Sequence, residues 1–562
     1  MPLIEVKISD LERLIGKGIP TNELERYITS LKGEIEKIEE DTLEYEATHD
    51  RPDLFSAEGL ARAIKGLMKL ELGIRKFPIK EGNIRIMVEE VPYRPFIACA
   101  VVRNVQLGEE ALRQLMQLQE KLHLTYGRNR RKASIGLYDL DTITPPIYYK
   151  AISKERIRFI PLDMNKEMSA DEILHNHPKG IEYREILLGK HRYPLLFDSE
   201  GKVLSMPPII NSEDTKVSVR TRNVFIDVTG TDINAVLGIL TIMTTSVVER
   251  ASGGYIETVI ISYPSETIIS PVLKEEKVNL STSYANKILG LSLSPDEICE
   301  YLLMMRFNAE VLSQDEVKVT VPCYRMDILH PIDLVEEVAM AYGFDNLIPE
   351  LPEDHVTIGK VNPIELFSQK IREIMAGLGF QEVANYMMSN KEILLKRMRL
   401  KSTPLVEVKN PVSERFSALR NWLLPGLLYV LSMSKGCGYP QRIFEVGDVA
   451  LIDLSLENRV KEERHLAAVI ASSKVTLVDA LVILDALART LGVTFKYITP
   501  EKVHPSFIEG RYGKIFLNTK EIGFVGEVHP EVLLNFNLEV PVTAFEIRLD
   551  TLFNEYIKYV LS

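Results

Sequence analysis

Hydrophobic and polar residues change their spacing several times along the chain, and each change marks a region with its own expected elements. Polar residues at 9–12 and 22–25 fit the capping box that begins a helix, and Ser56 would begin a third helix. Together with an extended stretch at 44–48, they predict a small α/β domain at residues 1–75.

The charged, Pro- and Gly-containing segment 72–88 predicts a linker. Between residues 92 and 262, short apolar runs are interrupted by Pro and Gly, which predicts a mixed α/β domain. Strands are expected at 96–102, 147–152 and 223–228. The uncharged stretch 233–248 predicts a buried helix, because it is shorter than the ~20 residues that cross a bilayer.

Residues 270–350 predict a further small α/β domain with strands at 309–312 and 317–321. Ser294, followed by Pro295 and Glu297, has every feature of a helix start. A second helix is expected from about Pro331 to Gly343, since glycine commonly ends helices.

Residues 356–562, which follow Pro349 and Pro352, alternate helical and strand spacing and predict an α+β sheet domain. Its helix is expected at 362–378, and its strands at 381–388, 442–449, 466–471, 513–517, 523–528 and 543–547. The predicted fold class is therefore α+β with several domains.

Composition narrows the class of protein. A length of 562 residues allows about three to five domains. Hydrophobic residues make up 46% and charged residues 26%, which excludes a disordered or collagen-like chain. Four cysteines without a CxxC pair exclude a disulfide-stapled chain and argue against a Cys-based zinc site. The first residues lack a basic start followed by an apolar run, so a cytoplasmic protein is expected.

The net charge of −12 gives no evidence for nucleic-acid binding. Any RNA contact must come from a partner chain or from a local basic patch. The densest such patch contains Arg128, Arg130, Arg131 and Lys132, which would hold RNA phosphates or form a solvated loop. His175 and His177 are expected to be surface loop histidines, because they lack a nearby Cys or third His.

The most specific chemistry lies in a run of acidic residues around the helix expected at Pro331. At 100° per residue, Asp333, Glu336 and Glu337 share one helix face and are predicted to project outward together, with Asp327 in the segment before them. Mg²⁺ prefers carboxylate and water ligands. Spacing alone favours the other interpretation, a solvated acidic first turn stabilised by the helix dipole.

Several motifs occur together in a recognisable order. HPIDLVEEVAMAYGFDNLIPELP follows YRMDIL, and DRPDLFSAEGLARAIKG lies at residues 50–66. MPPIINSEDT, VTGTD, NPVSERFSALRNWLLPGLL, RIFEVGDV and GEVHP complete the set. In this order the motifs resemble the β subunit of phenylalanyl–tRNA synthetase, of the archaeal and eukaryotic type, over nearly the whole chain.

The resemblance implies a set of partners and cofactors. Mg²⁺ would be held by Asp327, Asp333, Glu336 and Glu337 and shared with an α subunit. An (αβ)₂ heterotetramer would bind tRNA(Phe), and ATP would be a substrate of the holoenzyme.

The terminal domain would have the antiparallel sheet of class II synthetases. It would be inactive, because no Gly-rich segment ending in arginine follows residue 361. Arg420 and Arg442 are expected to form salt bridges or interface contacts. The run 423–428, Met387 and Met388 are expected in the core by default, while the resemblance favours an interface with α.

There is a physical reason to expect a hydrolytic site in addition to the synthetic one. Tyrosine is phenylalanine plus one hydroxyl, and an apolar pocket rejects an added hydroxyl by only ~10². The resemblance places an editing site for Tyr-tRNA(Phe) in residues 92–262, with Ser205, Asn211, Asp227 and Thr229 as candidates. Asp227 would recognise the tyrosine, while Ser205 or Thr229 would orient a hydrolytic water. In the alternative, Asp227 and Thr229 only cap a turn.

Two other functions remain open at this point. A stand-alone aminoacyl-tRNA deacylase would be monomeric and would hydrolyse Tyr-tRNA without a partner. A non-enzymatic RNA-binding scaffold would have no α partner at all. The NPVSERF and LLPGLL stretches favour a partner, because a free deacylase would not need them.

Overall fold

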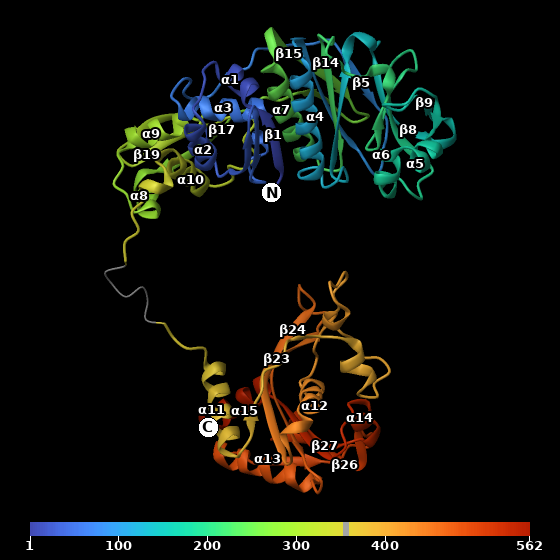
Figure 1. The fold of residues 1–562 in the computed structure, drawn as a ribbon, viewed down its shortest axis with the longest axis vertical. Coiled ribbons are helices and arrows are strands. Elements are labelled where there is room, and N and C mark those ends of the chain that lie inside the picture. The colour runs from blue at the N-terminus through green and yellow to red at the C-terminus, as the bar shows by residue number, and fades with distance from the viewer. Residues whose placement is uncertain (352–358, 562) are drawn as a thin grey trace. The chain divides into compact units, whose positions relative to one another are not determined.

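The computed structural model describes residues 1–351 and 359–561, which fall into two units, Met1–Glu350 and Leu351–Ser562 (Figure 1). Both units contain helices and sheets, so the predicted multidomain α+β class is confirmed. The expected boundaries at Pro352 and residue 356 lie outside the described residues. No helix in the described parts of the chain is long and apolar enough to cross a membrane.

The chain starts with a small antiparallel sheet of β1 (Leu3–Lys7), β3 (Thr42–Glu46) and β2 (Glu34–Glu39). Helices α1 (Ile8–Ile15), α2 (Thr21–Ser30) and α3 (Ala57–Leu67) accompany it.

Two of the three predicted helix starts in this region are wrong. Helix α1 begins directly after β1, and Ser9 lies inside it with its hydroxyl donating to Asp41 at 2.7 Å. Helix α2 begins at Thr21, directly after Pro20, so the predicted cap Asn22 lies inside the helix. The Ser56 cap of α3 is confirmed, because the Ser56 hydroxyl accepts from the backbone of Gly59.

The largest sheet of the first unit has eleven strands, in the order β13-β12-β11-β8-β5-β15-β6-β14-β7, with β4 and β16 also paired to β15. These are β4 (Ile79–Lys80), β5 (Arg85–Val88), β6 (Phe96–Val105), β7 (Ala133–Asp139), β8 (Ile147–Ser153), β11 (Arg192–Phe197), β12 (Val203–Met206), β13 (Ile210–Asn211), β14 (Val224–Gly230), β15 (Ala251–Ser262) and β16 (Thr267–Ser270). Because β4 and β5 come from segment 72–88, the linker expected there is wrong.

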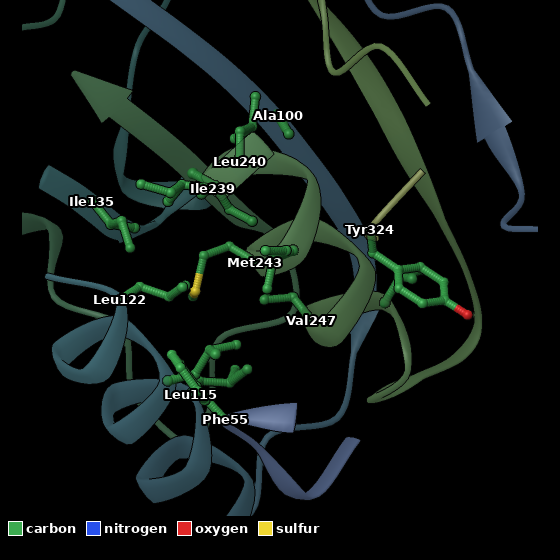
Figure 2. Close-up of a cluster of buried hydrophobic side chains, with 14 of the residues drawn as sticks. Phe55, Ala100, Leu115, Leu122, Ile135, Ile239, Leu240, Met243, Val247 and Tyr324 are labelled. Carbon is green, nitrogen blue, oxygen red and sulfur yellow. The ribbon is translucent and has the colours of Figure 1, made fainter. Parts of the chain in front are cut away.

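One face of β6, β14 and β7 is covered by α4 (Glu109–Leu124) and α7 (Ile233–Val248). Figure 2 shows Leu122 of α4 beside Met243 of α7, and Leu115 of α4 and Ile135 of β7 belong to the same hydrophobic cluster. Helix α7 has the predicted bounds and is buried along most of its length, so the buried-helix prediction is confirmed. The candidate site lies on the opposite face of β7 and β14.

A side lobe contains α5 (Ala170–Asn176) and α6 (Pro178–Tyr183), packed over β11 and the short strands β9 (Arg158–Phe159) and β10 (Met168–Ser169). His175 is exposed as expected, but His177 is buried. The His177 ring caps α6, because its Nδ1 accepts from the backbone of Lys179 at 3.1 Å.

The last part of the first unit is a three-stranded antiparallel sheet, β17 (Glu276–Ser281), β19 (Glu316–Val321) and β18 (Asn308–Ser313). Helices α8 (Thr282–Leu289), α9 (Pro295–Met304) and α10 (Pro331–Tyr342) complete it. The reciprocal hydrogen bonds of the Ser294–Glu297 capping box are present, and α10 ends at Gly343, so both predictions are confirmed.

The second unit is built on a seven-stranded sheet in the order β20-β23-β24-β28-β27-β26-β25, antiparallel except for the first pair. The strands are β20 (Gln381–Glu382), β23 (Gln441–Ile452), β24 (Val460–Ala471), β25 (Phe495–Ile498), β26 (Phe507–Leu517), β27 (Lys520–Val528) and β28 (Val542–Arg548). A short pair, β21 (Met388–Ser389) and β22 (Ala418–Leu419), lies apart from it.

Helices pack against this sheet through two separate hydrophobic clusters. One cluster includes α11 (Pro363–Gly377), α13 (Leu477–Leu491) and α15 (Leu549–Leu561), and the other includes α12 (Leu424–Met433) and α14 (Pro530–Asn535). The apolar run at 423–428 is buried as expected. Met388 is exposed, so the core interpretation is wrong for it, and a place in an interface stays a prediction.

Candidate functional site

The floor of the candidate site is formed by β7 and β14, which pair antiparallel. Ser134 lies opposite Thr229, and Gly136 lies opposite Asp227. Because side chains alternate along a strand, these residues and Tyr138 share the face turned away from α4 and α7.

One wall of the site is formed by β12 and β13, which lie at the opposite end of the strand order from β7 and β14. These two strands pair Ser205 with Asn211. The Tyr138 hydroxyl lies 2.8 Å from Ser205 Oγ, so the two ends of the path meet at the site. Three of the four candidates from the sequence, Ser205, Asn211 and Asp227, therefore line one space, together with Ser134 and Tyr138. This space is about 10 Å³, room for about one water molecule.

Asp227 is a buried carboxylate at the centre of this space. Burial raises its pKa to about 6, against the opposing effects of the Tyr138 hydroxyl, 2.5 Å from Oδ1, and of the Arg94 charge. A Cβ at Gly136 would overlap both the Tyr138 hydroxyl and the Asp227 carboxylate, so only glycine leaves room for this contact.

Thr229 lies on the same strand, next to the space rather than in its lining. Its hydroxyl accepts from Nε of Arg94 at 2.9 Å and lies 3.2 Å from Ser134 Oγ. Both Asp227 and Thr229 lie within β14, so the alternative that they only cap a turn is wrong. Sequence reasoning missed Arg94, Ser134, Gly136 and Tyr138.

The basic segment at 128–132 is divided between the site and the surface. Arg128, Asn129 and Arg130 all have positive φ, of 48°, 52° and 64°. This turn directs Arg130 inward, where it donates to the Ile209 carbonyl at 2.9 Å and pairs with Glu120 at 2.7 Å.

Arg130 is therefore part of neither a solvated loop nor an exposed basic patch, because its buried guanidinium donates to the wall of the site. Arg128 and Arg131 are exposed, and Lys132 pairs with Asp232 at 3.0 Å. Contacts of these three residues with tRNA stay a prediction.

The acidic residues around α10 do not project outward as a group. Glu337 is 1% exposed, because its carboxylate accepts from the buried guanidinium of Arg325. The same guanidinium donates to Asp327 at 2.9 Å and 2.6 Å. The prediction from helical spacing is wrong for Glu337, because the spacing carries no information about the buried guanidinium of Arg325.

The remaining two carboxylates also have partners of their own. Asp333 accepts from the backbone of Leu329 and His330, both at 2.7 Å, and so caps α10. Glu336 pairs with Lys32 at 3.1 Å. Across the described ranges, no three His, Cys, Asp or Glu side chains are grouped to hold a metal ion. The four carboxylates in this arrangement do not fit a Mg²⁺ site.

In the second unit, Arg420 forms a buried ion pair with Glu445 at 2.6 Å, as its predicted salt bridge requires. Its Nε also donates to the Asp448 carbonyl at 2.8 Å. A neighbouring cavity of about 230 Å³ is lined partly by Asn385 and Trp422. Arg442 is exposed.

Comparison with known proteins gives matches along almost the whole chain. Residues 103–245 match the B3/4 domain, residues 278–344 the tRNA synthetase B5 domain, and residues 348–549 the phenylalanyl tRNA synthetase beta chain CLM domain. The polar site on β7 and β14 falls within the first match, and the acidic helix α10 within the second.

Whole proteins match as well. The phenylalanine–tRNA ligase beta subunit of Thermofilum pendens is 47% identical, over 99% of each chain, and that of Pyrococcus furiosus is 45% identical, over 98% of this chain and all of the relative. A solved N-terminal fragment of the phenylalanyl-tRNA synthetase beta subunit from Pyrococcus horikoshii is 42% identical, with a TM-score of 0.59. The alignment covers 61% of this chain and 99% of the fragment.

Proposed function

The chain belongs to the family of phenylalanine–tRNA ligase β subunits, and from this premise we propose that it has two tasks. Together with an α subunit it supports the ATP-dependent attachment of phenylalanine to tRNA(Phe). Through the site between β7, β14, β12 and β13, it hydrolyses mischarged Tyr-tRNA(Phe). The observation that carries the second task is the buried Asp227 carboxylate among hydroxyl groups.

Asp227 supports tyrosine as the substrate. A tyrosine differs from phenylalanine by a phenol, and a phenol donates a strong hydrogen bond to a buried carboxylate. A site with such an acceptor discriminates against the analogue that lacks the hydroxyl, because its buried polar group would be left unpaired. In the closed arrangement, the phenol of Tyr138 supplies this hydrogen bond.

Entry of a tyrosine requires the walls to separate, because the present space holds about one water. The turn at Pro207 and Pro208 is the wall that joins β12 to β13. Arg130 holds the residues after this turn through the Ile209 carbonyl and is itself held by Glu120. Opening of this turn, with Asp227 fixed in the sheet, admits the aminoacyl end of the tRNA.

The editing proposal is tested with the αβ complex. We expect Asp227→Asn to slow hydrolysis of Tyr-tRNA(Phe) by at least about 10-fold, because Asn offers a weaker acceptor than a carboxylate. Phenylalanylation of tRNA(Phe) should not change. Asp171→Asn, at an exposed residue paired with Lys154 in the same region, is the matched control. Equal hydrolysis rates in both variants would reject Asp227 as part of the editing site.

The second unit is proposed to be a class II-like sheet domain without a synthetic site of its own. Its mainly antiparallel seven-stranded sheet supports the first part. Arg420 is committed to Glu445 and to the Asp448 carbonyl, so it is not available to a nucleotide phosphate. ATP and Mg²⁺ would then act at a site on the α subunit, in an (αβ)₂ assembly.

This second proposal has its own test. The full chain alone should show no phenylalanine-dependent exchange between ATP and pyrophosphate, whereas its complex with the α subunit should. Mass measurement of the complex gives the stoichiometry. Exchange by the lone chain would mean that it has a synthetic site of its own, whereas failure to associate with α would favour the deacylase or scaffold alternatives.

A further inference from the structure

Arg94 is a buried cation without a carboxylate partner. It is 2% exposed, and among the described residues no carboxylate oxygen lies within 4.0 Å of its guanidinium. Other buried arginines of the chain have such partners, as Arg250 has in Glu58, Arg325 in Glu337 and Arg420 in Glu445. An unpaired buried charge is costly and calls for an explanation at the site that it faces.

The guanidinium of Arg94 is directed at two hydroxyl groups. Nε donates to Thr229 Oγ1 at 2.9 Å, and Nη2 donates to Ser134 Oγ at 2.8 Å and to the Thr229 carbonyl at 2.6 Å. Nη1 donates to the carbonyl of Arg130 at 3.1 Å. The backbone of Arg94 is also held, because its carbonyl accepts from the Tyr149 hydroxyl at 2.8 Å.

These contacts determine where the hydroxyl protons point. A guanidinium only donates, so both hydroxyl oxygens accept from it and their protons must go elsewhere. The two oxygens lie 3.2 Å apart, so one of the two hydroxyl protons forms a hydrogen bond between them. The other hydroxyl proton has no acceptor within this pair. Ser134 lines the small space beside Asp227, and Thr229 does not. When Thr229 donates to Ser134, the remaining proton is that of Ser134, and it is directed into the space.

From this geometry we infer that Ser134 is the hydrogen-bond donor to the ester carbonyl of the bound aminoacyl-tRNA, and that Arg94 is the positioning residue that orients it. This inference rests on the proposed editing function. As water attacks, negative charge develops on the carbonyl oxygen, and a preorganised donor with a buried cation behind it stabilises that charge. Because Arg94 donates to the oxygens of Ser134 and Thr229, neither hydroxyl acts as the general base.

The step is a simple hydrolysis. The oxygen of water forms a bond to the carbonyl carbon, and the bond from that carbon to the ribose oxygen breaks. The ribose oxygen leaves with one proton of the water, and the second proton passes to solvent as the tyrosine carboxylate forms. Ser134 keeps its proton throughout, since it only donates a hydrogen bond.

The test is a double-mutant cycle in the αβ complex, with hydrolysis of Tyr-tRNA(Phe) as the activity. Ser134→Ala should lower kcat about 100-fold and leave KM within about 3-fold. Arg94→Met should lower kcat by a similar factor, but by less than about 3-fold when Ser134 is already alanine. Arg103→Met is the matched control, because Arg103 is paired with Glu257 on neighbouring strands outside the site.

Two outcomes would overturn the inference. The first is an unchanged kcat in Ser134→Ala, a mild substitution that keeps the test valid even if Arg94→Met does not fold. The second is a full Arg94→Met effect in the Ser134→Ala background, which would mean that Arg94 acts only on the general structure. Absence of hydrolysis by the unmodified complex would instead reject the proposed editing function itself.

Discussion

Asp227 is held inside the first unit with no Lys or Arg nitrogen of the described residues within 4.0 Å of its carboxylate. Burial raises its pKa to about 6, so between about pH 4 and pH 6 the folded protein binds a proton that the unfolded chain has lost. The free energy of unfolding therefore falls as pH rises through this window and is then constant. The protein keeps this charged group at a cost in stability at neutral pH.

Replacing Asp227 with Asn should recover part of that stability. We expect Asp227→Asn to raise the free energy of unfolding at pH 7.5 by at most about 3 kcal/mol, at about 1.4 kcal/mol per pKa unit. The gain should shrink as pH falls from about 6 to about 4, because Asp227 is then protonated and neutral. Denaturant unfolding at several pH values measures it, with Asp171→Asn as the control. A gain that does not vary with pH would contradict the argument.

The sequence contained part of the information about these residues. Ser134, Gly136 and Tyr138 alternate with the apolar Ile135 and Leu137, a period of two that predicts one polar strand face. This signal was available and was not used. Arg94 gave no local signal, because it precedes β6 and reaches Ser134 and Thr229 only through tertiary structure. Asp227 could be proposed from its motif, but its burial could not.

At the scale of secondary-structure elements, helix α10 is fixed to the segment before it by Arg325. The guanidinium bridges Asp327 and Glu337, and all three side chains are largely buried. Burial acts against the charged form of Asp327, but the charge and hydrogen bonds of Arg325 hold its pKa below its usual value. Arg325 thus forms ion pairs with both carboxylates, and Arg51 lies 3.8 Å from Glu337 as a second, more distant cation.

Arg325→Met should destabilise the first unit by about 3–5 kcal/mol, because Asp327 and Glu337 lose the guanidinium that bridges them and only the more distant Arg51, 3.8 Å from Glu337, remains. Thermal or denaturant unfolding measures the loss. Lys32→Met is the matched control, since Lys32 pairs with the more exposed Asp50 and Glu336 and should cost no more than about 1 kcal/mol.

The same variant tests the metal prediction for α10. If Mg²⁺ restores the stability of Arg325→Met but does not stabilise the unmodified protein, then Asp327 and Glu337 hold a divalent cation only when the guanidinium is absent. Equal stabilisation of both proteins by Mg²⁺ would mean that the ion binds beside Arg325, contrary to the arrangement described here.

In the second unit, His465 on β24 lies between two glutamates from neighbouring positions of the sheet. Its Nδ1 is 2.7 Å from Glu546, and its Nε2 is 3.5 Å from Glu463. Burial lowers its pKa, but the two carboxylates outweigh this effect and raise the pKa to about 9. The Glu546 carboxylate also accepts from the backbone of Leu423 and Leu424 at the start of α12.

The pH dependence of this contact has a definite sign. The folded state keeps a proton on His465 that the unfolded chain loses near pH 6.5, so the contribution is complete below pH 6.5 and is lost as pH rises to about 9. We expect the stability of the second unit to fall by up to about 1.4 kcal/mol per pH unit in this window. His465→Gln should remove that slope. Parallel slopes for both proteins would show that His465 is neutral in the folded state.

Elements with a complete local pattern were predicted well, and elements that depend on distant contacts were not. Helix α7 and the Ser294 cap of α9 are encoded in consecutive residues. Strands β4 and β5 both pair with β15, more than 170 residues later, and β5 also pairs with β8, so the local sequence of their segment indicated a linker instead. Similarly, Asp41 takes the Ser9 hydroxyl and leaves no cap at the start of α1.

At the scale of the whole molecule, each unit has its own hydrophobic cores. Two clusters lie entirely within residues 1–350, and two lie entirely within the described part of the second unit. A separate core is what allows a domain to fold independently. The order of the motifs predicted several domains, while the long sheet that joins segments 79–270 could not be read from local spacing.

A fragment of residues 1–350 should therefore fold by itself and unfold in one cooperative transition. Its transition should keep the pH dependence attributed to Asp227, while the change between pH 6.5 and 9 attributed to His465 should be absent. Circular dichroism and calorimetry of the fragment beside the full chain measure both. A fragment with helical signal but no cooperative transition would show that its core needs the second unit.

The meeting of β7 and β12, from the two ends of the sheet path, has a consequence for biosynthesis. The residues around Asp227 span positions 94 to 229. Strands β7 and β14 pair with each other, and so do β12 and β13, but neither strand of one pair is hydrogen-bonded to a strand of the other. A nascent chain on the ribosome does not have the complete site until the last of these strands has emerged and the sheet has formed. If the site hydrolyses aminoacyl-tRNA as proposed, unfinished or misassembled copies lack that activity.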